Sequence, residues 1–194
     1  MNHGPFTLNP PQWVADYLRT KGFVYSSPED RMMLVIDLAR LNVAHGTGGP
    51  FGAAVFEAES GRFISAGVNL VVSAGCSVLH AEIVALILAQ RICGTFDLGA
   101  PDMPSYELAA STEPCAMCLG AIPWSGVRRL LCGARSEDAE AVGFDEGDKP
   151  AEWVAALNRR GIEVVQDCCR ARAAAMLRIY SESGGIIYNS RRGG

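Results

Sequence analysis

The chain has 194 residues, of which 49% are hydrophobic and 20% charged, the composition of an ordinary globular protein. Its formal net charge is −4, with 17 Lys and Arg against 21 Asp and Glu, which argues against binding to nucleic acid or to an anionic membrane. No apolar run reaches the about 18 residues that span a bilayer, and a secretion signal is not evident, so we expect a soluble, cytoplasmic protein.

The first half of the chain predicts an arm, a helix and a hairpin. Residues 1–26 are rich in proline and predict an N-terminal arm with one short amphipathic turn. Ser27 suits a helix N-cap and Pro28 the first helical position, and acidic residues follow in the first turn, so a helix is predicted to start there. Residues 51–56 and 63–69, joined around a turn at residues 59–61, predict two hairpin strands. Residues 70–79 are predicted to form a loop.

Helices and strands are predicted to alternate in the second half. We expect helices at residues 81–92, 115–124, 150–160 and 168–183, and strands at 106–110, 127–132 and 162–165. A helix between the fourth and fifth strands is a crossover connection, which implies that these two strands are parallel. The predicted fold class is a three-layer α/β/α domain over residues 1–194, with a mixed five-stranded sheet and a tail from about residue 184 to 194.

The chain has seven cysteines, an odd number without a secretion signal, which favours free thiols and metal binding over disulfides. Five of them have no ligand spacing with a histidine. We expect these five to be small buried or half-buried residues: Cys76, Cys93, Cys132, Cys168 and Cys169.

Two short motifs combine metal ligands with an acid. The sequence reads HAE at residues 80–82 and PCAMC at residues 114–118. His80, Cys115 and Cys118 form the donor set of a Zn²⁺ site with a fourth position left for water, and one ion per chain is expected. Cys115 and Cys118 are three residues apart, so a helix places both on one face, and the helix start favours thiolates. We expect two helix starts, at the ends of adjacent strands, to hold the ion.

Glu82 stands two residues beyond His80, beside the metal but outside its ligands. A carboxylate there can take the proton of a zinc-activated water and pass it to the substrate. In the alternative interpretation Glu82 only caps its helix and the zinc is structural. A structural zinc normally has four protein ligands, and no fourth Cys or His has the right spacing. The two motifs together match the signature of zinc nucleobase deaminases.

The chain resembles the cytidine deaminase-like superfamily and, within it, the bacterial guanine deaminases. The resemblance extends from about Ser27 onward and includes motifs shared by many purine, pyrimidine and tRNA deaminases. These motifs are PFGAAV at 50–55, GVN at 67–69, HAEI at 80–83, TEPCAMC at 112–118 and GAIPW at 120–124. The narrower assignment rests on GFDEG at 143–147 and on IIYN at 186–189.

The resemblance implies hydrolysis of guanine to xanthine and ammonia by a zinc-activated hydroxide, with Glu82 moving protons and Glu146 as a second carboxylate over the ring. It also implies a homodimer, and a C-terminal segment with Tyr188 that closes over the pocket. Asn69 is expected to pair with the edge of the base and Phe51 to stack on it. Ala81 and Trp124 complete the expected substrate-binding residues, Trp124 in the same or a neighbouring subunit.

Three alternatives stay open. The substrate could be another small aminoheterocycle, such as ammeline, cytosine or a nucleoside, because pocket shape decides among similar edges. A tRNA adenosine deaminase would share the centre but needs a cationic groove, and adjacent basic pairs are few, among them Arg128-Arg129 and Arg191-Arg192. A zinc-stabilised interaction module without activity is the third.

Overall fold

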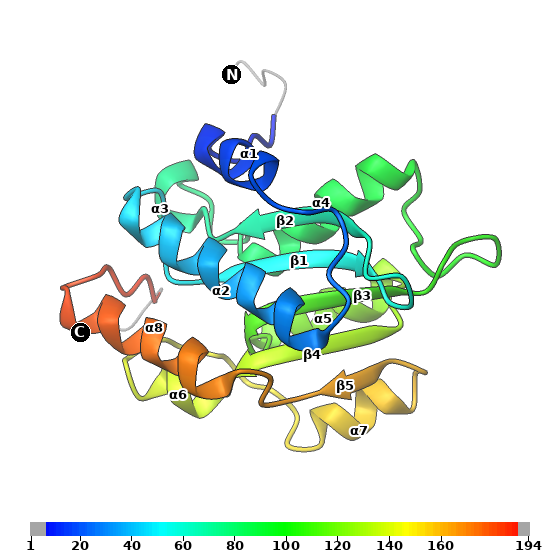
Figure 1. Cartoon of the computed structure of the whole chain (residues 1–194). Helices are drawn as coiled ribbons and strands as arrows, with labels where there is room; N and C mark the ends of the chain where they lie inside the picture. The colour runs from blue at the N-terminus through cyan, green and yellow to red at the C-terminus, as the bar shows by residue number, and fades with distance from the viewer. Residues whose placement is uncertain (1–6, 190–194) are drawn as a thin grey trace, which may run out of the picture.

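The computed structural model describes residues 7–189 (Figure 1). Its centre is a five-stranded sheet with the strand order β2-β1-β3-β4-β5. β1 runs antiparallel to β2 and β3, whereas β3, β4 and β5 are parallel. The predicted hairpin and the predicted parallel pair are therefore confirmed. The strands are β1 (Gly52–Glu57), β2 (Phe63–Val68), β3 (Tyr106–Thr112), β4 (Arg129–Ala134) and β5 (Glu163–Val165).

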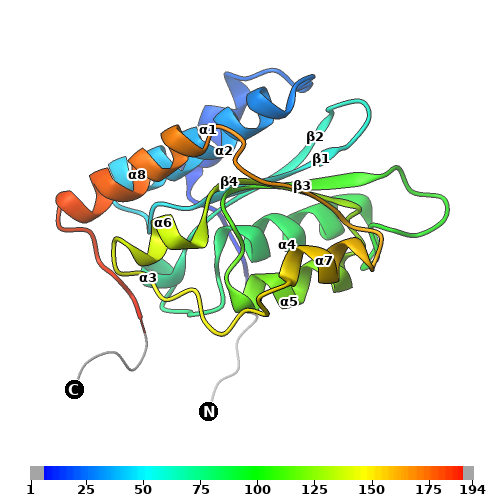
Figure 2. The same cartoon turned by 90° about the horizontal axis from the view of Figure 1, so that it is seen from below.

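Helices cover both faces of the sheet, as Figure 2 shows. One face carries α2 and α8, and the other carries α4, α5 and α7. Buried side chains form two apolar clusters, which correspond to these two faces. The predicted three-layer α/β/α fold is confirmed. The helices of these layers are α2 (Pro28–Ala44), α4 (Ala81–Cys93), α5 (Ala116–Ser125), α7 (Trp153–Asn158) and α8 (Arg170–Glu182).

The N-terminal arm packs on α2 of its own chain. It forms α1 (Gln12–Arg19), in which the Trp13 ring stacks on His45 with centroids 5.1 Å apart. The Tyr17 hydroxyl donates a 2.8 Å hydrogen bond to Asp37. Residues 1–6 of the predicted arm and 190–194 of the predicted tail, with Arg191-Arg192, lie outside the described residues.

Local capping explains where the elements agree with the prediction and where they do not. Ser27 Oγ accepts a 3.1 Å hydrogen bond from Asp30 N, so α2 begins as predicted. The loop prediction for residues 70–79 is wrong at its start, where the structure has α3 (Val71–Ala74). Just before this helix, Asn69 Oδ1 accepts a hydrogen bond from Val71 N at 3.2 Å. A short α6 (Ser136–Glu140) follows β4, and α7 is shorter than predicted.

A buried carboxylate, Glu107, forms ion pairs that connect α2, β3 and β4. Arg31 of α2 and Glu107 of β3 are 3% and 0% exposed, and Arg31 Nη1 lies 3.1 Å from Glu107 Oε1. Arg129 Nη1 of β4 lies 3.2 Å from the other carboxylate oxygen, Glu107 Oε2.

None of the helices within residues 7–189 is long and apolar enough to cross a lipid bilayer.

Candidate active site

Three predicted metal ligands converge at one end of the sheet. His80 Nδ1 lies 3.4 Å from Cys115 Sγ and 3.6 Å from Cys118 Sγ. A tetrahedral zinc with Zn–N near 2.0 Å and Zn–S near 2.3 Å places such atoms about 3.5 Å apart. No fourth His, Cys, Asp or Glu from the described part of the chain joins this group. The residues therefore fit a zinc ion with three protein ligands and one open position.

Helix starts position these ligands. His80 is the N-cap of α4, Cys115 is the N-cap of α5, and Cys118 lies in the first turn of α5. The prediction that the two helices start at adjacent strands is wrong, because β1 lies between β2 and β3 and α4 begins only after residues 69–79. The ligands meet because α4 and α5 pack side by side on one face of the sheet.

The two cysteine ligands differ in how readily they lose their protons. Hydrogen bonds from Cys118 and His80 lower the pKa of the Cys115 thiol to about 4. The hydrogen bond to Cys115, together with burial, raises the pKa of Cys118 far above the usual thiol value. One thiolate thus shares the proton of its neighbour, and a divalent cation bound between them releases that proton.

Glu82 faces the same cavity from the first turn of α4. The residue is 8% exposed. Burial, and then the charge of Cys115, raises the pKa of its carboxyl to about 6. A carboxyl group with this pKa can both accept and return a proton near neutral pH, which is what a general acid and base needs.

A cavity of about 370 Å³ opens beside the ligands His80 and Cys115. This size is in the range of small-molecule sites. Phe51, Asn69, Glu146 and Tyr188 line it together with His80, Cys115 and Glu82, whereas Cys118 is fully buried behind it. Other lining residues had no predicted role of their own: Val71, Ser77, Met117 and Phe144. Asn189, which also lines the cavity, belongs to the C-terminal segment that was expected to close over it.

Two predicted substrate-binding residues do not line this cavity. The Ala81 side chain is 1% exposed and belongs to the apolar cluster beneath α4. Trp124 is 87% exposed and lines a separate groove between α4 and α5. The reason is its place near the end of α5, since the helix carries the chain away from Cys115 at its start. A role for Trp124 in the pocket of a neighbouring subunit stays a prediction.

Asn69 presents one side of its amide to the cavity. The residue is 1% exposed, and its Oδ1 is occupied by the hydrogen bond from Val71 N. Its backbone carbonyl accepts a 2.8 Å hydrogen bond from Asn42 Nδ2. The Nδ2 group of Asn69 has no hydrogen-bond partner among residues 7–189, so it is a free donor at the wall of the cavity.

Glu146 brings a second carboxylate to the cavity. It is 6% exposed, and its Oε2 has no hydrogen-bond partner among the residues described. Burial, and then the charge of Cys115, raises the pKa of this carboxyl to about 8. Buried polar atoms are nearly always paired, so an unpaired oxygen at a cavity wall indicates a place where a ligand binds.

The C-terminal segment packs against the loop that carries Glu146. Asn189 Nδ2 donates to the Gly143 carbonyl at 2.7 Å, and Asn189 Oδ1 accepts from Asp145 N at 3.0 Å. The Tyr188 ring lies 5.4 Å from that of Phe144 and 6.4 Å from that of His80. Phe144 also contacts Phe51 edge-to-face, with centroids 4.9 Å apart. Aromatic rings therefore form one wall of the cavity.

The fold and the zinc-type centre define a deaminase-like hydrolase, and comparison with known proteins agrees. The family model for the cytidine and deoxycytidylate deaminase zinc-binding region matches residues 26–134, and the chain belongs to this family. The chain is 37% identical over 123 residues to the guanine deaminase of Bacillus subtilis. This alignment covers 60% of this chain and 74% of the relative.

Two solved structures are similar over nearly the whole chain. The guanine deaminase from Nitrosomonas europaea superimposes with a TM-score of 0.87 and 48% identity, covering 94% of this chain and 98% of that one. The protein NE0047 in complex with 2,6-diaminopurine superimposes with a TM-score of 0.88 and 49% identity, covering 95% and 97%. The predicted resemblance and the expected zinc cofactor are confirmed.

Proposed function

We propose that this chain is a zinc-dependent aminohydrolase that converts guanine and water to xanthine and ammonia. The observation that carries the proposal is the convergence of three zinc-type ligands, Glu82 and Glu146 on one cavity. The similarity to the Nitrosomonas europaea guanine deaminase over 94% of the chain supports guanine as the base, and so does the shorter match to the Bacillus subtilis guanine deaminase. We also propose that residues 1–194 form one catalytic domain.

The protein groups divide the work of proton transfer and recognition. His80, Cys115 and Cys118 hold the zinc, which supplies Lewis acidity and an acidified water when bound. Glu82 takes the proton of the attacking water, gives it to a ring nitrogen beside the carbon that bears the amine, and assists protonation of the leaving amine. Its burial beside the ligands keeps this exchange out of bulk water.

Recognition of the base uses a hydrogen-bond donor on one side of the cavity and an acceptor on the other. Asn69 Nδ2 donates to a carbonyl oxygen of the base. Glu146 accepts from the amide or amino N–H groups of guanine and can pass a proton to the departing amine. Phe51 and Tyr188 contact the faces of the ring. Guanine carries both a carbonyl acceptor and N–H donors, so it satisfies Asn69 and Glu146 together.

The substrate assignment is tested by ammonia release from guanine, adenine, cytosine, cytidine, guanosine and ammeline, with zinc-loaded protein. We expect the highest kcat/KM with guanine and xanthine as its product. Faster release from ammeline or cytosine would reassign the substrate within the same chemistry. Release from none of them would support the interaction module instead, and inosine formed in tRNA would support the tRNA-acting alternative.

We propose further that the chain forms a homodimer through the face of α4 and α5. This face presents a protruding Trp124 beside a groove lined by Ile83, Leu86 and Ile87. Because the indole and the groove lie on the same face, the Trp124 side chain of each copy can occupy the groove of the other across a two-fold axis. Exposed apolar groups of this kind favour association. We place the enzyme in the cytoplasm, where Cys115 and Cys118 stay reduced for zinc.

A further inference from the structure

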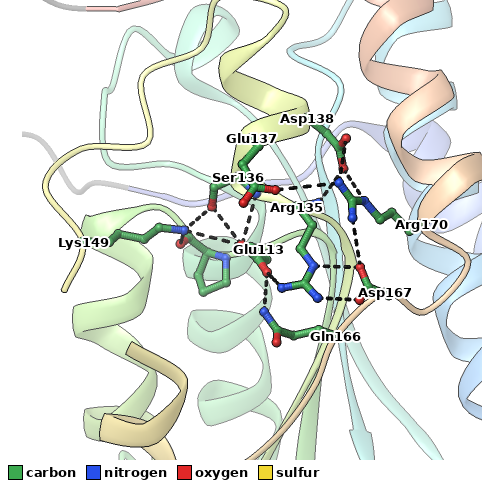
Figure 3. A network of polar contacts seen from close by, with 10 residues as sticks. Glu113, Arg135, Ser136, Glu137, Asp138, Lys149, Gln166, Asp167 and Arg170 are labelled. Atoms are coloured by element: carbon green, nitrogen blue, oxygen red, sulfur yellow. Dashed lines mark hydrogen bonds and ion pairs between the residues drawn. The ribbon is translucent and has the colours of Figure 1, made fainter. Parts of the chain in front are cut away.

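A buried carboxylate anchors the turn that leads from β3 into Cys115. Glu113 directly follows β3, and its side chain is 5% exposed. Its Oε1 accepts hydrogen bonds from Arg135 Nη1 at 3.2 Å and Gln166 Nε2 at 2.5 Å. Its Oε2 accepts from the backbone N–H and the hydroxyl of Ser136 at 3.1 and 3.0 Å. Residues that follow β4 and β5 therefore jointly fix the position of the Glu113 side chain (Figure 3).

Lys149 enters this network from the far end of the loop that carries Glu146. Its side chain is 11% exposed, and Nζ lies 3.9 Å from Glu113 Oε2. Nζ donates to the Pro114 carbonyl at 3.1 Å and to the hydroxyl of Ser136. The Trp153 ring lies against the ammonium group, with its centroid 5.3 Å from Nζ. Figure 3 shows the lysine reaching toward Ser136 and Glu113.

The loop that carries Glu146 is thus bonded to the chain on both sides of Cys115. On one side, the Pro114 carbonyl accepts from Lys149. On the other side, Ala116 N donates to the Glu146 carbonyl at 2.8 Å. Because these two bonds flank the ligand, they fix the position of the Cys115 turn relative to the second carboxylate.

The charge of Glu113 does not by itself explain why the ammonium group of Lys149 is placed here. Arg135 is already paired with Glu113, and Gln166 and Ser136 satisfy the remaining lone pairs. The ammonium group lies closer to the Ser136 hydroxyl and to the Pro114 carbonyl, the latter at 3.1 Å, than to the carboxylate at 3.9 Å. A charge-assisted bond to the backbone beside a metal ligand sets the position of that ligand.

We infer that Lys149 is a positioning residue, whose ammonium group acts through the Pro114 carbonyl to hold the Cys115 ligand turn and the Glu146 loop in one arrangement. The inference rests on the proposed function for its effect on turnover. Its effect on metal retention follows from the contacts with the Cys115 turn alone.

The test compares Lys149→Met with Lys21→Met. Lys21 also lies over an aromatic ring, that of Tyr17 at 4.7 Å, but it is exposed in the segment that follows α1, so it is a matched control. Zinc transfer to a chromogenic chelator is followed for both variants, with near-ultraviolet circular dichroism to confirm that each is folded. Absorption of the cobalt(II)-substituted proteins reports the geometry of the thiolate ligands.

We expect Lys149→Met to release zinc about tenfold faster than the wild type and to change the cobalt spectrum, with kcat for guanine lowered about tenfold. Lys21→Met should match the wild type in all three measurements. Lys149→Arg keeps a charged donor for the Pro114 carbonyl, so it should restore zinc release to within about threefold. Should Lys149→Met not fold, Lys149→Gln, which also lacks the charge, replaces it with the same expected zinc release and cobalt spectrum.

Wild-type zinc release and an unchanged cobalt spectrum in a folded Lys149→Met protein would overturn the inference. An equal change in Lys21→Met would also overturn it, because the effect would then be general. A wild-type protein that releases no ammonia from guanine would instead contradict the proposed function, and the zinc and cobalt measurements would still decide the role of Lys149.

Discussion

The backbone carbonyl of Glu146 accepts a 2.8 Å hydrogen bond from the N–H of Ala116, the residue that follows Cys115. The first N–H groups of a helix have no partner within the helix, so this bond completes the start of α5 with a residue from a distant loop. It places the Glu146 side chain at the same cavity as the zinc ligands. The geometry of the metal end of α5 and the position of the second carboxylate are therefore linked.

Glu146→Gln should lower kcat/KM for guanine by about 100-fold while zinc content stays near one per chain. The amide has nearly the same shape, but its NH₂ group faces the N–H groups of the base and can no longer take a proton. Steady-state ammonia release and metal analysis check this. A variant with normal turnover would remove Glu146 from the mechanism.

Asn69→Asp separates the two roles of Asn69. The carboxylate keeps an acceptor for Val71 N, so α3 should persist, but the donor that faces the cavity is lost. We expect kcat/KM for guanine to fall about 10- to 100-fold, since an unpaired buried group costs about 1–3 kcal/mol. Asn158→Asp, on the exposed end of α7, is the matched control and should be normal. Equal kinetics of the two variants would contradict the recognition role.

Trp124→Glu should dissociate the proposed dimer, because it places a charge at the centre of the apolar face of α4 and α5. Light scattering should then give the mass of a single chain, against twice that mass for the wild type. Ile179→Glu changes an exposed apolar residue on α8, on the opposite side of the sheet, and should leave the dimer intact. A wild type that is itself monomeric would refute the proposed interface.

Arg31→Met should destabilise the fold strongly, because it leaves Glu107 buried with only Arg129 as a charged partner. Removing one partner of a buried ion pair costs about 3–5 kcal/mol, which corresponds to a fall of about 10 °C in Tm for a chain of this length. Calorimetry measures it. Arg62→Met breaks the exposed pair with Glu57 and should shift Tm far less, since water screens that pair. Equal shifts would contradict the account of the core.

Local signals explain how much could be predicted from the sequence. The cap at Ser27, the hairpin turn and the two ligand motifs each depend on neighbours in the chain, and all of them appear in the structure. The helix starts at His80 and Cys115 were predictable for the same reason.

Other features depend on contacts between distant segments. β1 inserts between β2 and β3, which no spacing in the sequence reveals. Trp124 stands in a motif close to the ligands, yet the length of α5 carries it to another surface. The aromatic wall formed by Phe144 and the contact of Lys149 with Pro114 bring together residues 35 or more positions apart. Hydrophobic periodicity does not encode such pairings.

The most direct test of the central claim is turnover of Glu82→Gln with its zinc bound. The three zinc ligands are unchanged in this variant, so zinc content and circular dichroism should match the wild type. Ammonia release from guanine should fall about 1000-fold, because the group that moves the protons is gone. Unchanged ammonia release in the zinc-loaded variant would contradict the claim that this cavity is a deaminating centre driven by Glu82.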